Sequence, residues 1–159
     1  MNTTETTEAK MLTVLHLKAG DLHPEVRVIP HELGNLQALV GGWLDVVRAG
    51  SYLPKTLANT VLSKYDIWVN DEGLINNLPF NICLNVQELM AKRYDYAGIL
   101  AGDIFLAGHD DECNTTSVQM EDVPELKRVL QSLILVNPER EAKLQRSIAV
   151  LDGEDEKYV

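Results

Sequence analysis

The segment Leu33–Val47, which reads LGNLQALVGGWLDVV, changes from helical to strand periodicity along its length. In its first half, apolar residues recur three and four positions apart, as on one face of a short amphipathic helix. Gly41 and Gly42 follow at once, and glycine readily takes the left-handed conformation in which many helices end. The residues from Trp43 to Val47 then favour a strand. The segment therefore predicts a short helix followed directly by a strand.

Strands are expected on both sides of this segment. Residues 12–17 are apolar and residues 25–29 alternate polar with apolar, so together they predict a hairpin. Residues 65–69 alternate in the same way, and 78–81 favour an extended chain because a residue before proline avoids the helical region. Residues 97–108 indicate a buried strand with a tight turn or bulge at its start. This order predicts a small α+β fold with a mixed, mainly antiparallel sheet and packed helices.

The C-terminal quarter predicts a helical pair. Asp122 is placed to cap a helix that has Pro124 in its first turn and runs to about residue 135. A second helix is expected from residue 137 onwards, with Leu144, Ile148 and Leu151 on one face. The expected divisions are a disordered tail (1–10), an α+β core domain (11–121), C-terminal helices (122–152) and an acidic tail (153–159).

The chain is acidic. Its 159 residues include 14 Lys and Arg against 24 Asp and Glu, for a formal net charge of −10 and a pI near 4.8. This charge argues against direct binding to nucleic acid, which needs clustered cations to neutralise phosphates. No apolar run approaches the roughly 20 residues of a membrane-spanning helix, and the start lacks the order of a signal peptide. We therefore expect a cytoplasmic protein with no membrane contact.

No pattern of catalytic or metal-binding residues stands out. Cys83 and Cys113 are too isolated for a metal site or a disulfide framework. The only cluster of a histidine with carboxylates is 109–112, and adjacent residues of an extended chain point to opposite faces. Phosphate-binding loops, dinucleotide fingerprints and nucleophile elbows are all missing from the sequence. We expect no catalytic residue, no metal and no cofactor.

Amide and aromatic side chains form the candidate ligand-binding site. Amides both donate and accept hydrogen bonds, as recognition of a base or ribose requires. Aromatic rings stack on bases, and a Lys or Arg neutralises a phosphate. The expected set is Asn70, Glu72, Asn81, Trp43, Trp68, Lys64 and Arg93. The structural alternative is that the asparagines form turns and the aromatic rings belong to the core.

A second candidate is the acidic run 110–125, which contains six carboxylates and no Lys or Arg. A stripe of this kind can imitate a nucleic-acid backbone and occupy a basic groove on another protein. The structural alternative is a solvated face that keeps the protein soluble.

Several segments together resemble a domain of unknown function (family 3846) known from phages and mobile elements. They are Val26–Ile29, Leu36–Val47, Asn70–Gly73, Leu78–Asn81 and Ala101–Gly108, and the resemblance covers about residues 12 to 130. It implies a phage-like origin and a small α+β fold, and it carries over no catalytic residue.

These observations lead to two functional expectations. The first is a non-enzymatic phage protein that binds and sequesters a small nucleotide immune signal, as an oligomer whose C-terminal helices pair two chains. The alternative is an acidic inhibitor that docks on a host defence or regulatory protein, for example as a nucleic-acid mimic. If the protein is phage-encoded, either activity takes place in the cytoplasm of the host cell.

Overall fold

The computed structural model describes residues 10–48, 54–93 and 98–135 of the chain. The elements in chain order are β1 (Met11–Leu17), β2 (Glu25–Pro30), α2 (Leu33–Val40), β3 (Leu44–Arg48), α4 (Lys55–Ala58), the 3-10 helix η1 (Val61–Lys64), β4 (Asp66–Asn70), β5 (Phe80–Cys83), α5 (Val86–Met90), β6 (Ile99–Ala101), β7 (Ile104–His109), β8 (Thr115–Thr116), the 3-10 helix η2 (Met120–Asp122) and α7 (Val123–Leu133). The expected second C-terminal helix, the acidic tail and all of the N-terminal tail but Lys10 lie outside these residues. None of the described helices has the length and apolar character needed to cross a membrane.

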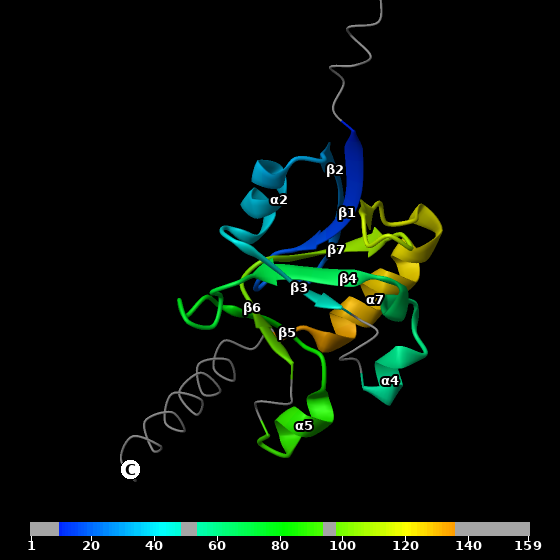
Figure 1. The fold of residues 1–159 in the computed structure, drawn as a ribbon. Coiled ribbons are helices and arrows are strands. Elements are labelled where there is room, and N and C mark those ends of the chain that lie inside the picture. Colours follow the sequence, from blue (N-terminus) through cyan, green and yellow to red (C-terminus); the bar gives the residue numbers. More distant parts are fainter. Residues whose placement is uncertain (1–9, 49–53, 94–97, 136–159) are drawn as a thin grey trace, which may run out of the picture.

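Most strands form one antiparallel sheet, in the order β2-β1-β7-β4-β3, with β8 paired to β7 (Figure 1). β1 and β2 pair from Met11 opposite Pro30 to His16 opposite Glu25, which confirms the predicted hairpin. The helix α2 ends at Gly41, whose φ of 77° is left-handed, as the glycine pair predicted. The chain is thus the α+β fold expected from the sequence.

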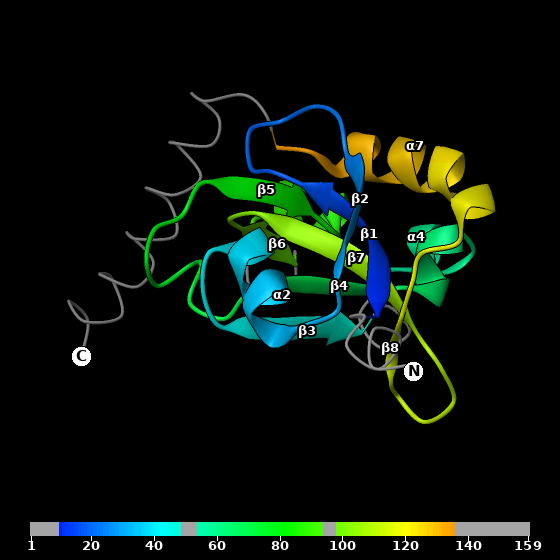
Figure 2. The ribbon, with the colours of Figure 1, turned by 90° about the horizontal axis from the view of Figure 1, so that it is seen from above.

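The two faces of this sheet are covered by different helices. α2 lies on one side of the sheet, and α7 with α4 lies on the other (Figure 1 and Figure 2). On the α2 side the core contains Leu12, Val14, Leu36, Leu39, Val40, Phe105 and Ala107. The larger core on the α7 side includes Leu15, Leu17, Leu57, Leu62, Ile67, Ile104 and Leu106. The sheet is therefore buried on both faces, which accounts for its long apolar strands.

The helix α7 belongs to this core. Its apolar stripe consists of Val123, Leu126, Leu130 and Leu133, all of which are buried against the sheet. From the sequence, such stripes were expected to pair two chains. In α7 the stripe is instead used inside the subunit, because a sheet face needs a helix to cover it.

A second, two-stranded sheet is formed by β5 and β6. The stretch 97–108 was predicted as one strand with a turn or bulge at its start, and this prediction is wrong in one respect: the turn separates two strands that belong to different sheets. The break lies at Gly102, whose φ is 83°. A Cβ at Gly102 would lie 2.8 Å from Leu78 Cδ1, so the chain needs glycine there.

Candidate functional site

The loop that leaves α2 and the turn that follows β4 meet at one end of the sheet. The backbone N–H of Asp71 donates to the carbonyl of Trp43 at 2.8 Å. Asn70 joins the two segments, since its Nδ2 donates to the Val40 carbonyl at 3.2 Å and its Oδ1 accepts from the Glu72 N–H at 2.8 Å. A Cβ at Gly42 would lie 2.8 Å from Asn70 Nδ2, so this glycine lets the amide approach. The Asn70 side chain thus holds the two segments together at this end of the sheet.

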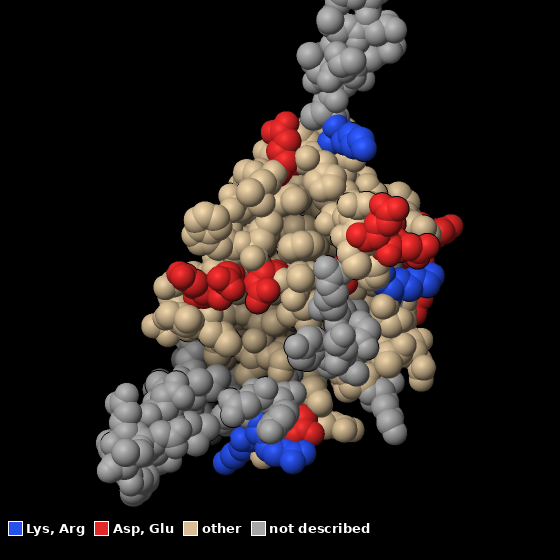
Figure 3. Space-filling view, viewed as in Figure 1, with Lys and Arg blue, Asp and Glu red and all other residues tan. Residues whose placement is uncertain are grey.

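This end of the sheet exposes large apolar side chains beside carboxylates. Trp43 is 70% exposed, and Leu74 and Ile75 in the turn are 54% and 79% exposed. Figure 3 shows acidic side chains gathered here, with no Lys or Arg of the described residues beside them in this view. We call this region the Trp43 surface and define it as Trp43, Asp45, Asp71, Glu72, Leu74 and Ile75.

Three residues of the predicted ligand set, Trp43, Asn70 and Glu72, therefore lie together. Glu72 is exposed and its Oε2 accepts a long hydrogen bond of 3.4 Å from Asn76 Nδ2. The amide of Asn70 already makes two hydrogen bonds within the protein, which leaves Trp43 and Glu72 as the groups of this set most open to a ligand.

Asn81 lies away from this surface, in the interior between the two sheets. It is 1% exposed, and its Nδ2 donates to the carbonyls of Leu17 and Gly102, each at 2.9 Å. Its Oδ1 is buried and has no hydrogen-bond partner in the part of the chain that the structure describes. Asn81 thus ties β1 to the turn between β6 and β7, and it does not converge with Asn70 and Glu72.

Trp68 lies on the α2 side of the sheet rather than at its end. Its ring stacks on Phe105 with 6.0 Å between centroids and 10° between planes. The side chain is half-buried and packs on the α2-side core. Its indole N–H is buried and has no hydrogen-bond partner among residues 10–48, 54–93 and 98–135. For Trp68 the structural alternative, a packing role, is the one that the geometry supports.

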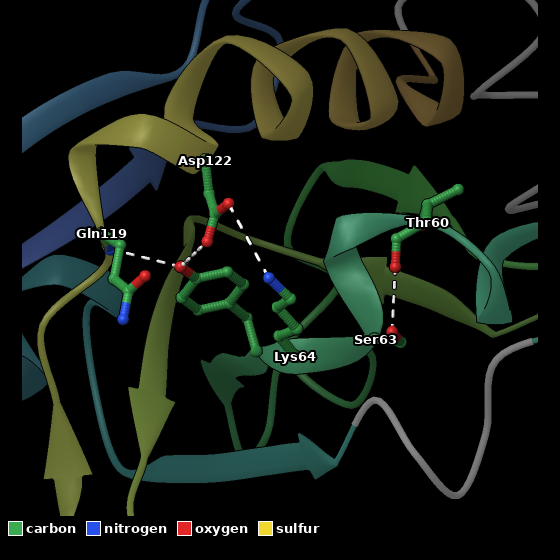
Figure 4. Close-up of polar contacts among 6 residues, drawn as sticks. Thr60, Ser63, Lys64, Gln119 and Asp122 are labelled. Atoms are coloured by element: carbon green, nitrogen blue, oxygen red, sulfur yellow. Dashed lines mark hydrogen bonds and ion pairs between the residues drawn. The ribbon is translucent and has the colours of Figure 1, made fainter.

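The two predicted cations are also far apart. Lys64 lies just before β4, at the opposite end of that strand from Asn70, and its Nζ is 4.0 Å from Asp122 Oδ1 (Figure 4). Arg93 follows α5, where its Nε and Nη2 bind the carboxylate of Glu88 at 2.5 and 2.9 Å. Both cations are paired with carboxylates, and the structure brings neither to the Trp43 surface.

Tyr65 and Asp122 form a polar contact that the sequence analysis missed. The Tyr65 hydroxyl donates to Asp122 Oδ2 at 2.5 Å and accepts from the Gln119 N–H at 3.2 Å (Figure 4). Burial of the ring, reinforced by the hydrogen bond to Asp122, raises the pKa of Tyr65 to about 12. The Asp122 side chain makes no capping hydrogen bond to α7, so its predicted role as a side-chain cap is wrong. Its carboxylate fastens the start of α7 to β4 instead.

The predicted cluster of His109 with carboxylates is split by the local fold. His109 Nδ1 lies 3.0 Å from Asp66 Oδ2 on the neighbouring strand, and the Asp66 side chain is 3% exposed. Asp110 folds back on its own loop, where its Oδ1 accepts from the N–H groups of Glu112 and Asn114. These bonds, led by the one from Asn114, lower the pKa of Asp110. Among the described residues no group of three or more His, Cys, Asp or Glu is placed to hold a metal ion.

His16 is a buried packing residue, and the two cysteines differ in exposure. His16 is 4% exposed, and its Nε2 lies 2.8 Å from the Leu39 carbonyl. Burial lowers its pKa. Cys83 is buried and Cys113 is exposed.

The acidic run 110–125 is divided between structure and solvent. Two of its six carboxylates, Asp110 and Asp122, hold the loop and the start of α7. The others, Asp111, Glu112, Glu121 and Glu125, are exposed. Figure 3 shows acidic side chains gathered near β8 as well, with cationic groups beside them. The run therefore contains two carboxylates with a structural role and four others that are exposed to solvent.

Comparisons with known proteins give a family and no activity. No curated protein and no solved structure matches the chain. One family model, described as "Domain of unknown function (DUF3846)", matches residues 11–131, which span β1 to most of α7. Because the match covers more than half of the chain, the protein belongs to this family of domains of unknown function.

Proposed function

We propose that the protein is a non-enzymatic binding protein that docks on a basic partner protein through the Trp43 surface. The observation that carries this proposal is the 70% exposure of Trp43 at the end of the sheet where the turn with the exposed Leu74 and Ile75 also lies. Large apolar side chains grouped on a surface are typical of interaction sites, and tryptophan is enriched among the residues that dominate binding energy. A site of this kind binds by burying apolar area and needs no catalytic group.

The charge of the Trp43 surface favours a cationic partner. Asp45 follows Trp43 by two residues, Asp71 and Glu72 precede Leu74 in the turn, and all three carboxylates are exposed. Carboxylates next to exposed apolar residues increase the association rate with a basic groove and suppress acidic partners. This proposal keeps the expected acidic inhibitor but places its binding site on the Trp43 surface rather than in the run 110–125. In the phage setting that the family resemblance implies, the partner is a host defence or regulatory protein in the host cytoplasm, and the binding protein imitates the partner's nucleic acid.

Nucleotide sequestration is the second candidate, because Trp43, Asn70 and Glu72 do lie together. An exposed indole ring is a stacking platform for a base. The surrounding carboxylates, however, repel phosphate groups, and the predicted cations lie elsewhere in the fold. The repulsion between these carboxylates and phosphate groups thus favours protein binding over nucleotide sequestration.

Capture experiments with matched variants test the proposal. The tagged full chain is used as bait in lysate of a bacterial host, beside Trp43→Ala and a triple Asp45→Asn/Asp71→Asn/Glu72→Gln variant. Controls are Met120→Ala, another exposed apolar residue, and Asp111→Asn/Glu112→Gln/Glu121→Gln, which removes the same charge near β8. We expect a specific partner to be lost with both variants of the Trp43 surface and kept by both controls, with binding that weakens as salt rises.

Two other results would assign the protein a different binding site or a different ligand. A partner kept by Trp43→Ala but lost by the control near β8 would move the binding site to the acidic run. A thermal-shift screen of the wild-type protein with cyclic and linear nucleotides tests the second candidate, nucleotide sequestration. A stabilisation of about 2.7 kcal/mol at 100 times the dissociation constant, lost in Trp43→Ala, would replace protein binding by nucleotide sequestration.

A further inference from the structure

The outer edge of β2 carries unused backbone hydrogen-bonding groups. The His31 N–H donates to the Lys10 carbonyl at 2.7 Å, and the same register pairs Ile29, Arg27 and Glu25 with β1. Because successive residues of a strand turn their N–H and C=O groups to opposite sides, Val26 and Val28 point these groups away from β1. Pro24 and Pro30 flank these two valines and, like them, turn their backbone groups away from β1. The N–H that proline lacks therefore removes no hydrogen bond to β1.

The opposite edge of the sheet differs from β2 in this respect. In β3 the same alternation points the Val46 N–H outward, since the Trp43 carbonyl faces Asp71. Asp45 Oδ1 accepts this N–H at 2.8 Å, so a side chain of β3 itself occupies one of the outward donors of that edge. No described residue makes such a bond to Val26 or Val28. The edge of β2, which can be followed in Figure 2, therefore has neither of these donors occupied among the described residues.

The side chains of β2 give this edge a self-complementary charge pattern. Glu25 and Arg27 are exposed, lie two residues apart on the α2 side, and carry opposite charges. If two copies pair antiparallel about Val26, each Arg27 lies opposite Glu25 of the second copy, and the pair occurs twice by symmetry. If they pair about Arg27, two guanidinium groups oppose each other, which is unfavourable. Charge therefore favours the register centred on Val26 over the one centred on Arg27.

We propose that two copies of this chain associate through their β2 edges, antiparallel and centred on Val26, to form one continuous sheet. In this arrangement the Val26 N–H and C=O groups bond to their counterparts, and the Val28 N–H meets the Pro24 carbonyl of the second copy. Val28, which is 58% exposed, becomes covered. The contact is confined to one short strand in each copy, so the dimer is weak, with a dissociation constant of about 10 µM or higher.

Sedimentation equilibrium of the full chain, from about 10 µM to about 1 mM, tests the association. We expect a reversible monomer–dimer equilibrium that Arg27→Glu and Glu25→Arg each weaken by about tenfold or more, since each replaces attraction by repulsion across the pair. The double variant Glu25→Arg/Arg27→Glu restores the pair and should dimerise within about threefold of the wild type. Arg128→Glu and Glu125→Arg, at exposed positions of α7, make the same charge changes away from β2 and should leave association unchanged.

Backbone variants and amide exchange test the hydrogen bonds. Val28→Pro removes an N–H that does not bond to β1, so it should weaken the dimer while the monomer unfolds at the same temperature. Amide exchange at Val26 should slow as concentration rises. The proposal is overturned if the chain stays monomeric throughout the range, if Arg27→Glu and Val28→Pro dimerise like the wild type, or if the double charge swap fails to restore association while remaining folded.

Discussion

The two tryptophans of this protein lie in regions of opposite character. Trp68, in the middle of β4, stacks on Phe105 and packs on the core beneath α2. Trp43, in the loop before β3, is 70% exposed, and its carbonyl accepts from the N–H of Asp71 in the acidic turn after β4. Trp68 faces the helix because alternation along β4 places it there, whereas Trp43 precedes the strand at a point that none of the described helices covers.

This difference separates side chains that stabilise the fold from those that remain available for binding. A buried ring contributes to folding through contacts that it would lose in the unfolded chain. An exposed ring contributes little to folding and gains its contacts only when a partner covers it. Predictions of stability therefore test the comparison directly, because they require no knowledge of the partner.

The largest effect is expected for Trp68→Ala, which removes the stacked ring from the sheet face. We predict a loss of about 3 kcal/mol in the free energy of unfolding, measured by urea denaturation. Trp68→Phe keeps the ring and removes an indole N–H that has no partner among the described residues, so it should cost less than about 1.5 kcal/mol. A small effect of Trp68→Ala would contradict the packing role.

Asn81→Ala extends the comparison to an amide from the same predicted ligand set. It leaves the carbonyls of Leu17 and Gly102 without the Nδ2 donor in a buried place, so we expect a loss of about 2 kcal/mol. Asn76→Ala, in the exposed turn beside Trp43, is the matched control and should change stability by less than about 0.5 kcal/mol. Equal effects at both positions in urea denaturation would remove the distinction between interior and surface amides.

Tyr65, which is buried, provides a pH-dependent test of a third aromatic residue. Its pKa is raised to about 12 in the folded protein, whereas it is near 10 in the unfolded chain. The unfolded state therefore loses this proton first, so the stabilisation is complete below pH 10 and is lost as pH rises towards 12. Tyr65→Phe should cost about 1 kcal/mol at neutral pH and should flatten the fall in stability between pH 10 and 12. Identical pH profiles for both proteins in urea denaturation would mean that another group causes this fall.

The smallest effect on stability is expected for Trp43→Ala. Because most of the ring is already in solvent, the free energy of unfolding should change by less than about 0.5 kcal/mol. Fluorescence of the single-tryptophan variants Trp68→Phe and Trp43→Phe checks the exposure directly: the spectrum from Trp43 should be red-shifted and readily quenched by acrylamide. A loss as large as that of Trp68→Ala would show that Trp43 is part of the core.

The sequence predicted the main elements well, because their signals are local. The hairpin of β1 and β2 follows from alternation, and the end of α2 follows from Gly41. The separation of β6 from β7 was not predicted, since Ile99 and Ile104 are equally apolar and only the surrounding strands decide which sheet each joins. Likewise, the contact of Asp122 with Tyr65 joins residues far apart in the chain, and no local pattern distinguishes it from a helix cap.

Of the candidate ligand set, the sequence by itself determined the chemistry of each side chain and the proximity of Asn70 to Glu72, which are two residues apart. It also determined the net charge of −10 and the helix-to-strand order around Gly41, but it assigned Trp43 to the strand, which begins at Leu44 in the structure. Only the tertiary structure decided that Asn81 and Trp68 face the interior, that Lys64 and Arg93 are paired elsewhere, and that β2 is an open edge of the sheet. The physical reason is that residue type and periodicity act over a few neighbours, whereas burial and pairing depend on which distant strands and helices cover a side chain.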